Sequence, residues 1–214
     1  NTILNFETSV QDLAVDGKMT IFSNHISDTI PTVLFWGDSH AGMLNFEKDL
    51  NNVNIFKLIT PACPSLLETY RTGNVGNASN CNEIEDELKI KEYITELAPD
   101  VIVLMNRYHL YLFGAWEKGK LQHKKHFIFK NNSKNDSFLS RKVALEHGLT
   151  KSIEFITSIG AKCVLIRPIA TIAKHGQIIE ALSNGLEEVS GNQDSFDFTI
   201  IDSIFSNIID EDIL

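Results

Sequence analysis

The sequence predicts an α/β domain, built on a parallel sheet of about five strands with helices on both faces. Short runs of β-branched and aromatic residues alternate with longer segments of helical periodicity, the order expected for a parallel sheet. Pro, Gly, Asn and Asp stand between these segments, where they end regular elements. With 214 residues, of which 43% are hydrophobic, the chain is long enough for one domain with a substantial core.

The expected strands are short apolar runs of the kind found in buried parallel sheets. They comprise residues 32–36, 54–59, 101–105, 162–167 and 198–202. Residues 1–30 are polar and only weakly patterned, so we expect a linker, a lead-in segment or an edge element there. The domain proper is then residues 31–214.

Helices are expected between these strands. Their ranges are about 40–50, 82–97, 137–158 and, less regularly, 176–190. The apolar face of the second helix is expected to contain Ile84, Leu88, Ile94 and Leu97. Gly160 is expected to stop the third helix. Residues 108–135 fit no regular element, and their lysine-rich part is expected to form an exposed hairpin or flap rather than a glycan contact.

Charge and composition exclude several classes of function. The net charge of −9 gives no electrostatic support for binding nucleic acid. No apolar run reaches the length that spans a bilayer. His123 and His126 form a His-x-x-His pair, but a metal site needs three or four convergent ligands, so we expect neither a metal nor another cofactor.

The chain has three cysteines. Cys63 and Cys81 flank a loop rich in Gly, Asn, Ser and Thr, whereas Cys163 lies inside an apolar run and is expected to pack in the core. The spacing fits one disulfide between Cys63 and Cys81, which implies an oxidising compartment. It fits two unrelated reduced thiols equally well.

The motif Gly37-Asp38-Ser39-His40 stands where the first expected strand ends and a helix begins. Ligands of open parallel sheets bind outside the carboxyl ends of the strands. A serine at the start of a helix has a backbone N–H that can stabilise an oxyanion, and the helix dipole favours negative charge there. Gly37 lets the backbone turn sharply and leaves room for an acyl group. Such residues also cap helices in ordinary turns, but the position after a buried strand favours Ser39 as a nucleophile.

These residues, extended to Trp36-Gly37-Asp38-Ser39-His40-Ala41, resemble the first block of SGNH (GDSL-type) hydrolases. A histidine after the serine is typical of the extracytoplasmic SGNH domains attached to type-3 membrane acyltransferases, which O-acetylate bacterial surface polysaccharides. Ala62-Cys63-Pro64, followed by Cys81, resembles the Cys-Pro segment of that branch and its partner cysteine. Residues 101–108 resemble its third block. The resemblance spans residues 32–168 and implies a flavodoxin-like three-layer α/β/α fold.

The resemblance also implies roles for individual residues. Ser39 is the expected nucleophile, its backbone N–H is one oxyanion donor, and Asp38 and His40 complete the catalytic motif. The imidazole of His40 is expected to point into the wall of the site. A second oxyanion donor falls near Ala62 or Cys63, where a backbone N–H can serve.

The third donor position falls at Arg107, with Asn106 and Tyr108 on either side of it as candidate oxyanion or substrate-binding residues. Arg107 has three possible roles. It can stabilise an oxyanion, hold an anionic substrate or form an ordinary salt bridge.

The family's base, a histidine preceded by aspartate in Asp-x-x-His, does not occur in this sequence. None of the seven histidines lies beyond residue 202, so we expect that motif after residue 214 and a domain that lacks its C-terminal end. Among the internal histidines, His175 follows the fourth expected strand and is the best substitute. A serine without a base is a poor nucleophile.

The resemblance therefore implies acyl transfer, usually of acetyl, through an acyl-Ser39 intermediate to a sugar hydroxyl of a bacterial surface polysaccharide. It implies an N-terminal transmembrane acyltransferase domain as partner and a location at the periplasmic, extracytoplasmic face of the inner membrane. One alternative is a standalone secreted carbohydrate acetylesterase. Another is a catalytically dead SGNH domain that binds glycan.

Overall fold

A computed structural model of the chain describes residues 20–24, 27–42, 52–71, 84–113, 115–117, 120–122, 128–130, 137–166 and 198–209. The helix expected at 176–190 lies outside the described residues, as do Cys81 and His175. No helix in the described ranges combines the length and the apolar character needed to cross a membrane.

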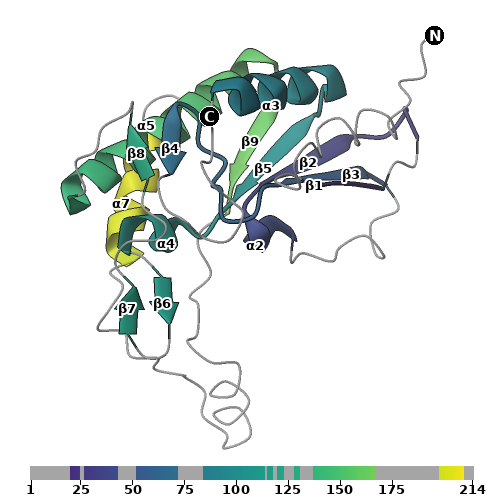
Figure 1. The fold of residues 1–214 in the computed structure, drawn as a ribbon. Helices are drawn as coiled ribbons and strands as arrows, with labels where there is room; N and C mark the ends of the chain where they lie inside the picture. The colour runs from purple at the N-terminus through teal and green to yellow at the C-terminus, as the bar shows by residue number, and fades with distance from the viewer. Residues whose placement is uncertain are drawn as a thin grey trace, which may run out of the picture.

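The centre of the domain is a five-stranded sheet of order β1-β3-β2-β5-β9 (Figure 1). The strands are β1 (Thr20–Asn24), β2 (Thr32–Gly37), β3 (Asn54–Ile59), β5 (Val101–Met105) and β9 (Lys162–Leu165). Strands β2, β3, β5 and β9 are parallel to one another. The edge strand β1 pairs antiparallel with β3. In chain order the parallel strands are arranged 2-1-3-4, the flavodoxin-like arrangement. The predicted α/β fold is confirmed.

Four of the five predicted strands are present, and the strands at 54–59 and 101–105 have the predicted bounds. The fifth prediction is wrong, because residues 198–202 begin helix α7 (Phe198–Ile209). Ile204, Phe205 and Ile208 are buried at helical spacing. A window of five residues does not distinguish the helical period from a continuous buried strand. The fifth strand of the sheet is β1 instead.

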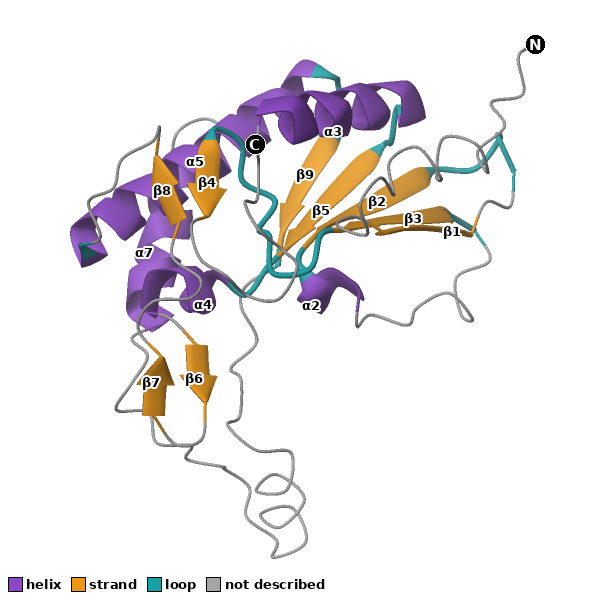
Figure 2. Ribbon diagram, viewed as in Figure 1, coloured by secondary structure: helices purple, strands orange, loops and turns teal. Residues whose placement is uncertain are grey.

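Helices α3 (Ile84–Leu97) and α5 (Phe138–Ser158) lie together on one face of the sheet (Figure 2). The N-cap of α5 is Ser137, whose hydroxyl accepts the N–H of Ser140 at 3.1 Å. The helix stops before Gly160, which has a φ of +82°. The left-handed conformation at Gly160 confirms its predicted role.

The buried face of α3 differs from the prediction at Leu88, which is 60% exposed. The residues of α3 that contact the core are Ile90, Tyr93, Ile94 and Leu97. These positions repeat at three and four residues. Leu88 lies off that stripe and faces solvent.

Both faces of the sheet carry buried side chains, as a three-layer fold requires. Leu34 and Leu104 belong to the large core cluster, together with residues of α3, α5 and α7. Phe35, Ile55 and Val103 form a separate buried cluster. Since neighbouring residues of a strand point to opposite faces, the continuous apolar runs found in the sequence reflect burial on both sides.

The segment expected to be irregular at 108–135 contains regular structure. It holds helix α4 (Tyr108–Phe113), the hairpin of β6 (Ala115–Glu117) with β7 (Lys120–Gln122), and β8 (Ile128–Lys130), which pairs with β4 (Thr69–Arg71). Tyr108 and Tyr111 lie one helical turn apart and are fully buried. The three-residue spacing of these two tyrosines therefore marks the buried face of the short helix α4.

Candidate functional site

The candidate site lies at the carboxyl ends of β2 and β5, the two central strands of the sheet. The chain leaves β2 toward β3 on one side and leaves β5 toward β9 on the other, which makes this the switch point of the sheet, the position where ligands of open α/β sheets bind. Ser39 is the first residue of the short helix α2 (Ser39–Gly42), and its side chain is exposed. The structure thus places Ser39 at the sheet edge where the sequence predicted it.

Gly37 is required by packing between the two strands. A Cβ at this position lies 1.9 Å from the carbonyl oxygen of Met105, the last residue of β5. The φ angle of Gly37 is not in the left-handed region. The glycine therefore admits the backbone of β5, rather than leaving room for an acyl group as the sequence analysis expected.

The carboxylate of Asp38 is 1% exposed and ties α2 to the start of α4. Its Oδ1 accepts the N–H of His40 at 2.9 Å, which makes Asp38 the cap of α2. Its Oδ2 accepts the N–H of Arg107 and the hydroxyl of Tyr111, each at 2.8 Å. With three donors, Asp38 fixes the start of α2 relative to Arg107 and Tyr111. This geometry suits a residue that orients its neighbours, and its catalytic role stays a prediction.

The side chain of Asn106 makes the reciprocal connection from β5 to β2. Its Oδ1 accepts the N–H groups of Asp38 at 3.2 Å and of Ser65 at 3.0 Å. Its Nδ2 donates to the hydroxyls of Ser65 at 2.7 Å and of Tyr108 at 3.1 Å. Asn106 is 2% exposed and uses all its hydrogen-bonding groups, so it has none left for an oxyanion. We call the Asp38 and Asn106 side chains, with these bonds, the clamp.

Tyr108 is a core residue, although the sequence analysis placed it among candidate substrate contacts. It is fully buried, its ring meets that of Phe205 edge-on with centroids 5.2 Å apart, and its hydroxyl accepts from Asn106. Burial raises the pKa of Tyr108 above its usual value, although the hydrogen bond from Asn106 opposes the shift. Tyr108 therefore supports the clamp from within the core.

Three cationic or ionisable side chains, those of His40, Arg107 and His109, lie close enough to shift one another's charge, and with Ser39 we call them the rim. His40 Nδ1 lies 3.7 Å from Asp38 Oδ1. Burial lowers the pKa of His40, the Asp38 carboxylate opposes this, and the Arg107 guanidinium adds to it. Burial, with Arg107 and His40, lowers the pKa of His109 to about 4. Both imidazoles are consequently neutral at pH 7.

The half-buried guanidinium of Arg107 carries the positive charge of this rim. Its backbone is fixed by Asp38, but its buried Nε has no hydrogen-bond partner in the described part of the chain. Such a donor is costly to bury unless a ligand satisfies it. No ion pair joins Arg107 to a described carboxylate, so the ordinary salt bridge weighed from the sequence is not formed by these residues.

The Cys63 prediction has two parts. Its N–H donates to the carbonyl of Thr60 at 3.0 Å, which closes a turn, so this N–H does not point at an oxyanion in the structure. The Cys63 residue is buried, with 6% of its surface exposed. The expected partner, Cys81, lies outside the described residues, and the disulfide stays a prediction. Cys163 is a free thiol on β9, half-buried as expected of a packing residue.

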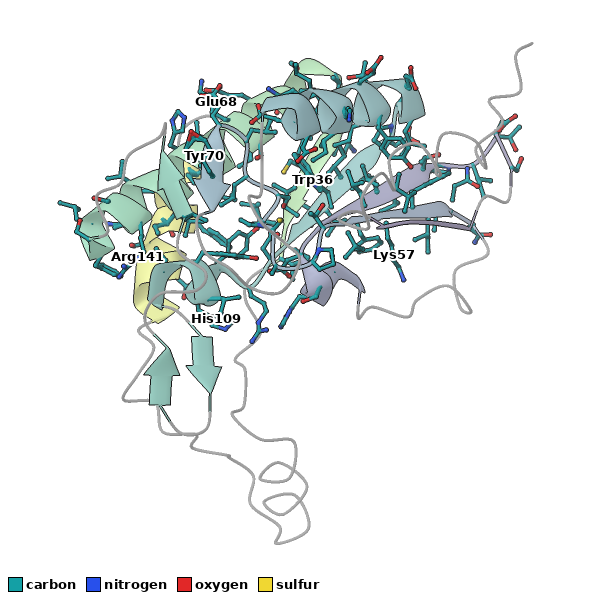
Figure 3. The ribbon with its side chains drawn as sticks, viewed as in Figure 1. Trp36, Lys57, Glu68, Tyr70, His109 and Arg141 are labelled. Atoms are coloured by element: carbon teal, nitrogen blue, oxygen red, sulfur yellow. The ribbon has the colours of Figure 1, made fainter. Side chains whose placement is uncertain are left out.

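No described side chain hydrogen bonds to the Ser39 hydroxyl. His147 pairs with Glu68, its Nε2 lying 2.9 Å from Oε2, and Figure 3 shows Glu68 on the opposite side of the domain from His109. The internal candidate His175 lies outside the described residues. Within the described ranges, no group of three or more potential metal ligands is present.

Ser65, Tyr111 and Ser152 are site residues that the sequence analysis missed. Ser65 and Tyr111 bond directly to the clamp, and Ser152 bonds to the backbone of Ser65 at 3.0 Å. Only Tyr111 had a signal in the sequence, its helical spacing from Tyr108. Contacts between residues 41 to 87 positions apart follow from the topology and leave no local pattern.

A family model described as "SGNH domain (fused to AT3 domains)" matches residues 13–202. The matched range covers most of the chain and contains the clamp, Ser39 and all five strands of the sheet. No curated protein and no solved structure matches the sequence.

Proposed function

This chain belongs to the SGNH domains that are fused to AT3 domains, and on that premise we propose that Ser39 carries an acyl group during transfer to a sugar hydroxyl. The family supports esterase or acyl-transfer chemistry in general. The finer proposal is acetyl transfer to a bacterial surface polysaccharide. The observation that carries it is the exposed Ser39 hydroxyl, held beside Arg107 by a clamp whose own polar groups are all satisfied.

The chemistry has two steps. In the first, Ser39 Oγ attacks the acyl carbonyl, a base takes the hydroxyl proton, and the donor's leaving group departs from the tetrahedral intermediate. In the second, the sugar oxygen attacks the acyl-Ser39 carbonyl and releases the Ser39 oxygen, which regains a proton. The backbone N–H of Ser39 supports the oxyanion in both steps. Arg107 either shares that role or holds an anionic group of the substrate.

The base is proposed to be the histidine of an Asp-x-x-His motif outside these 214 residues. No described histidine hydrogen bonds to the Ser39 hydroxyl. His40 is adjacent to Ser39 in α2 and its Nδ1 faces Asp38, and His147 is engaged by Glu68. The half-buried imidazole of His40, with Nδ1 toward Asp38, fits a wall of the site.

The proposed partner is the AT3 domain, a membrane acyltransferase that presents the acyl group to this domain. In that family the SGNH domain is extracytoplasmic. We place this chain accordingly at the periplasmic face of the bacterial inner membrane, where a disulfide between Cys63 and Cys81 is stable. Such a bond contributes about 3 kcal/mol by restricting the unfolded chain.

The test is intact-mass analysis of the full-length protein after reaction with a fluorophosphonate, which labels activated serines. One adduct is expected in the wild type and in Ser158→Ala, a matched change at an exposed serine of α5. Ser39→Ala is expected to remove it. Acetyl transfer from a chromogenic acetyl ester to an oligosaccharide acceptor then tests the second step.

Two other outcomes lead to two other functions. Release of acetate to water alone, with the same adduct, identifies a carbohydrate acetylesterase. Absence of the adduct from the wild type identifies an inactive glycan-binding module, which is the function favoured by the absence of a described base at Ser39.

A further inference from the structure

We propose that Ser152, a buried residue of α5, is a positioning residue for Ser39. It acts through the segment 65–67 and the clamp, and the inference rests on the proposed function of Ser39 as a nucleophile. Ser152 does not touch the reacting atoms. Its effect reaches them through an unbroken series of buried hydrogen bonds.

The first link joins α5 to the segment after β3. Ser152 is fully buried, and its hydroxyl lies 3.0 Å from the carbonyl of Ser65 and 2.8 Å from that of Gly148. The same oxygen accepts the N–H of Leu67 at 3.1 Å. The hydroxyl thus holds the Leu67 N–H, and its single proton is shared between the carbonyls of Ser65 and Gly148.

The second link joins this segment to the nucleophile turn. Ser65 donates its N–H to Asn106 Oδ1 at 3.0 Å and accepts from Asn106 Nδ2 at 2.7 Å. The same Oδ1 accepts the N–H of Asp38, the residue that precedes Ser39. Ser65, Asn106 and Asp38 are each 2% exposed or less, so water does not readily replace a lost bond in this series.

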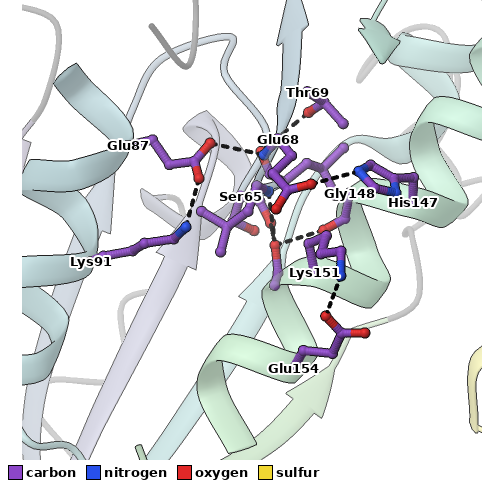
Figure 4. A network of polar contacts seen from close by, with 12 residues as sticks. Ser65, Glu68, Thr69, Glu87, Lys91, His147, Gly148, Lys151 and Glu154 are labelled. Carbon is purple, nitrogen blue, oxygen red and sulfur yellow. Dashed lines mark hydrogen bonds and ion pairs between the residues drawn. The ribbon is translucent and has the colours of Figure 1, made fainter. Parts of the chain in front are cut away.

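The segment is also held tightly against α5 (Figure 4). A Cβ on Gly148 lies 2.7 Å from Thr69 Cγ2 and 2.8 Å from Leu66 Cβ, so only glycine permits this approach. Glu68 has a φ of +55°, and its N–H donates to Glu87 Oε2 at 2.8 Å. Helices on both sides thus fix the segment, and a shift at Ser152 cannot be absorbed by slack in the backbone.

Loss of the Ser152 hydroxyl releases the Ser65 carbonyl and the Leu67 N–H together. Because the rest of the segment is held by α3 and α5, the adjustment passes to Ser65 and Asn106, and the Ser39 turn is held less firmly. Misplacement of a reacting group by about 1 Å costs about 100-fold in rate. A change transmitted through two links is expected to cost about tenfold.

The experiment measures the rate constant and the final extent of fluorophosphonate labelling at Ser39 in the full-length protein. Ser152→Ala and the near-isosteric Ser152→Cys are expected to label about tenfold more slowly than the wild type. The matched control is Ile156→Val, a fully buried change one helical turn away with no polar link to the segment. It is expected to keep the wild-type rate constant.

A merely structural role lowers the final extent, which reports the folded fraction, and leaves the rate constant of the folded fraction unchanged. Wild-type rate constants in both Ser152 variants therefore overturn the proposal. Should Ser152→Ala not fold, Ser152→Cys decides alone, because it leaves no cavity and weakens the hydrogen bonds. A wild type without an adduct at Ser39 overturns the proposed function instead, and this inference with it.

Discussion

Asn106 and Arg107 are neighbours in the chain, yet they belong to two regions with opposite properties. The clamp formed by Asp38 and Asn106 is buried, and each of its side-chain polar atoms has a partner. The rim beside it contains an exposed serine and an arginine whose Nε has no partner among the described residues. Satisfied buried groups stabilise a fold, whereas unsatisfied groups at a crevice are available to a ligand. The comparison assigns stability to the clamp and chemistry to the rim.

The largest expected effect comes from forcing the two strands of the clamp apart. In Gly37→Ala the new Cβ meets the carbonyl oxygen of Met105 at 1.9 Å, and this blocking atom is backbone, which cannot turn aside as a flexible side chain can. We expect a loss of more than about 3 kcal/mol in the free energy of unfolding, measured by urea denaturation.

Gly42→Ala, in the short helix α2 that follows β2, is the matched control. Its Cβ finds only ordinary contacts with Ile59, the nearest at 3.6 Å. Its expected effect is within about 1 kcal/mol. Equal effects of the two substitutions contradict the close approach of β2 and β5.

The next effect separates the clamp from the rim at adjacent residues. Asn106→Ala leaves two N–H groups and two hydroxyls without their partner in a buried site, at an expected cost of about 2–5 kcal/mol in unfolding free energy. Arg107→Ala removes a side chain that makes no hydrogen bond with described residues, so stability is expected to change by less than about 1 kcal/mol.

Activity is expected to respond differently. Arg107→Ala lowers kcat/KM about 100-fold if the guanidinium stabilises an oxyanion. A rise in KM with unchanged kcat assigns it to binding an anionic substrate group instead. Wild-type kinetics in Arg107→Ala remove Arg107 from the chemistry, and wild-type stability in Asn106→Ala contradicts the clamp.

The predictability of the fold from sequence follows the same division between local and distant causes. The strands 54–59 and 101–105 were found because continuous apolar runs of that length are a local signal. Residues 198–202 predict a strand although they begin helix α7. The helical period becomes visible only when Ile204 and Ile208 are included. Antiparallel β1 was expected only as an edge element, since pairing with β3 depends on the rest of the sheet.

The site divides similarly. Ser39 was predictable because the motif and its place after a strand lie within a few residues. The clamp was not, because the bonds of Asp38 to Arg107 and of Asn106 to Ser65 join residues that only the folded sheet brings together. The sequence therefore predicts Asn106 as a candidate oxyanion or substrate-binding residue. In the structure all the hydrogen-bonding groups of its amide have partners within the protein.

Protonation of the rim gives the next smaller effect. The pKa of His109 is lowered to about 4, from an ordinary value near 6.5, so the unfolded chain binds a proton in this interval and the folded chain does not. Above about pH 6.5 neither state binds this proton. As the pH falls toward 4, protonation of His109 in the unfolded chain alone lowers the free energy of unfolding, by on the order of 3 kcal/mol. His40 has a lowered pKa as well and acts with the same sign.

Urea denaturation at several pH values between 4 and 7 measures this slope. His109→Phe, which cannot be protonated, is expected to flatten the decline at low pH, so that its stability relative to the wild type is higher at pH 4 than at pH 7. Parallel curves for the wild type and His109→Phe show that His109 is not responsible.

The smallest effect concerns a thiol outside both regions and tests whether accessibility alone makes a group reactive. Cys163 is half-buried on β9, and burial raises its pKa to about 11. Its thiolate fraction at pH 7.5 is then about 100-fold below that of an ordinary cysteine, and native alkylation by iodoacetamide should be slower by a similar factor.

The same reagent tests the disulfide in the unfolded chain. In guanidinium without reductant, mass analysis is expected to show one alkyl group, and three after reduction if Cys63 and Cys81 are paired. Fast native alkylation contradicts the raised pKa, whereas slow alkylation beside fast fluorophosphonate labelling shows that the reactivity of Ser39 needs the environment of the rim as well as exposure.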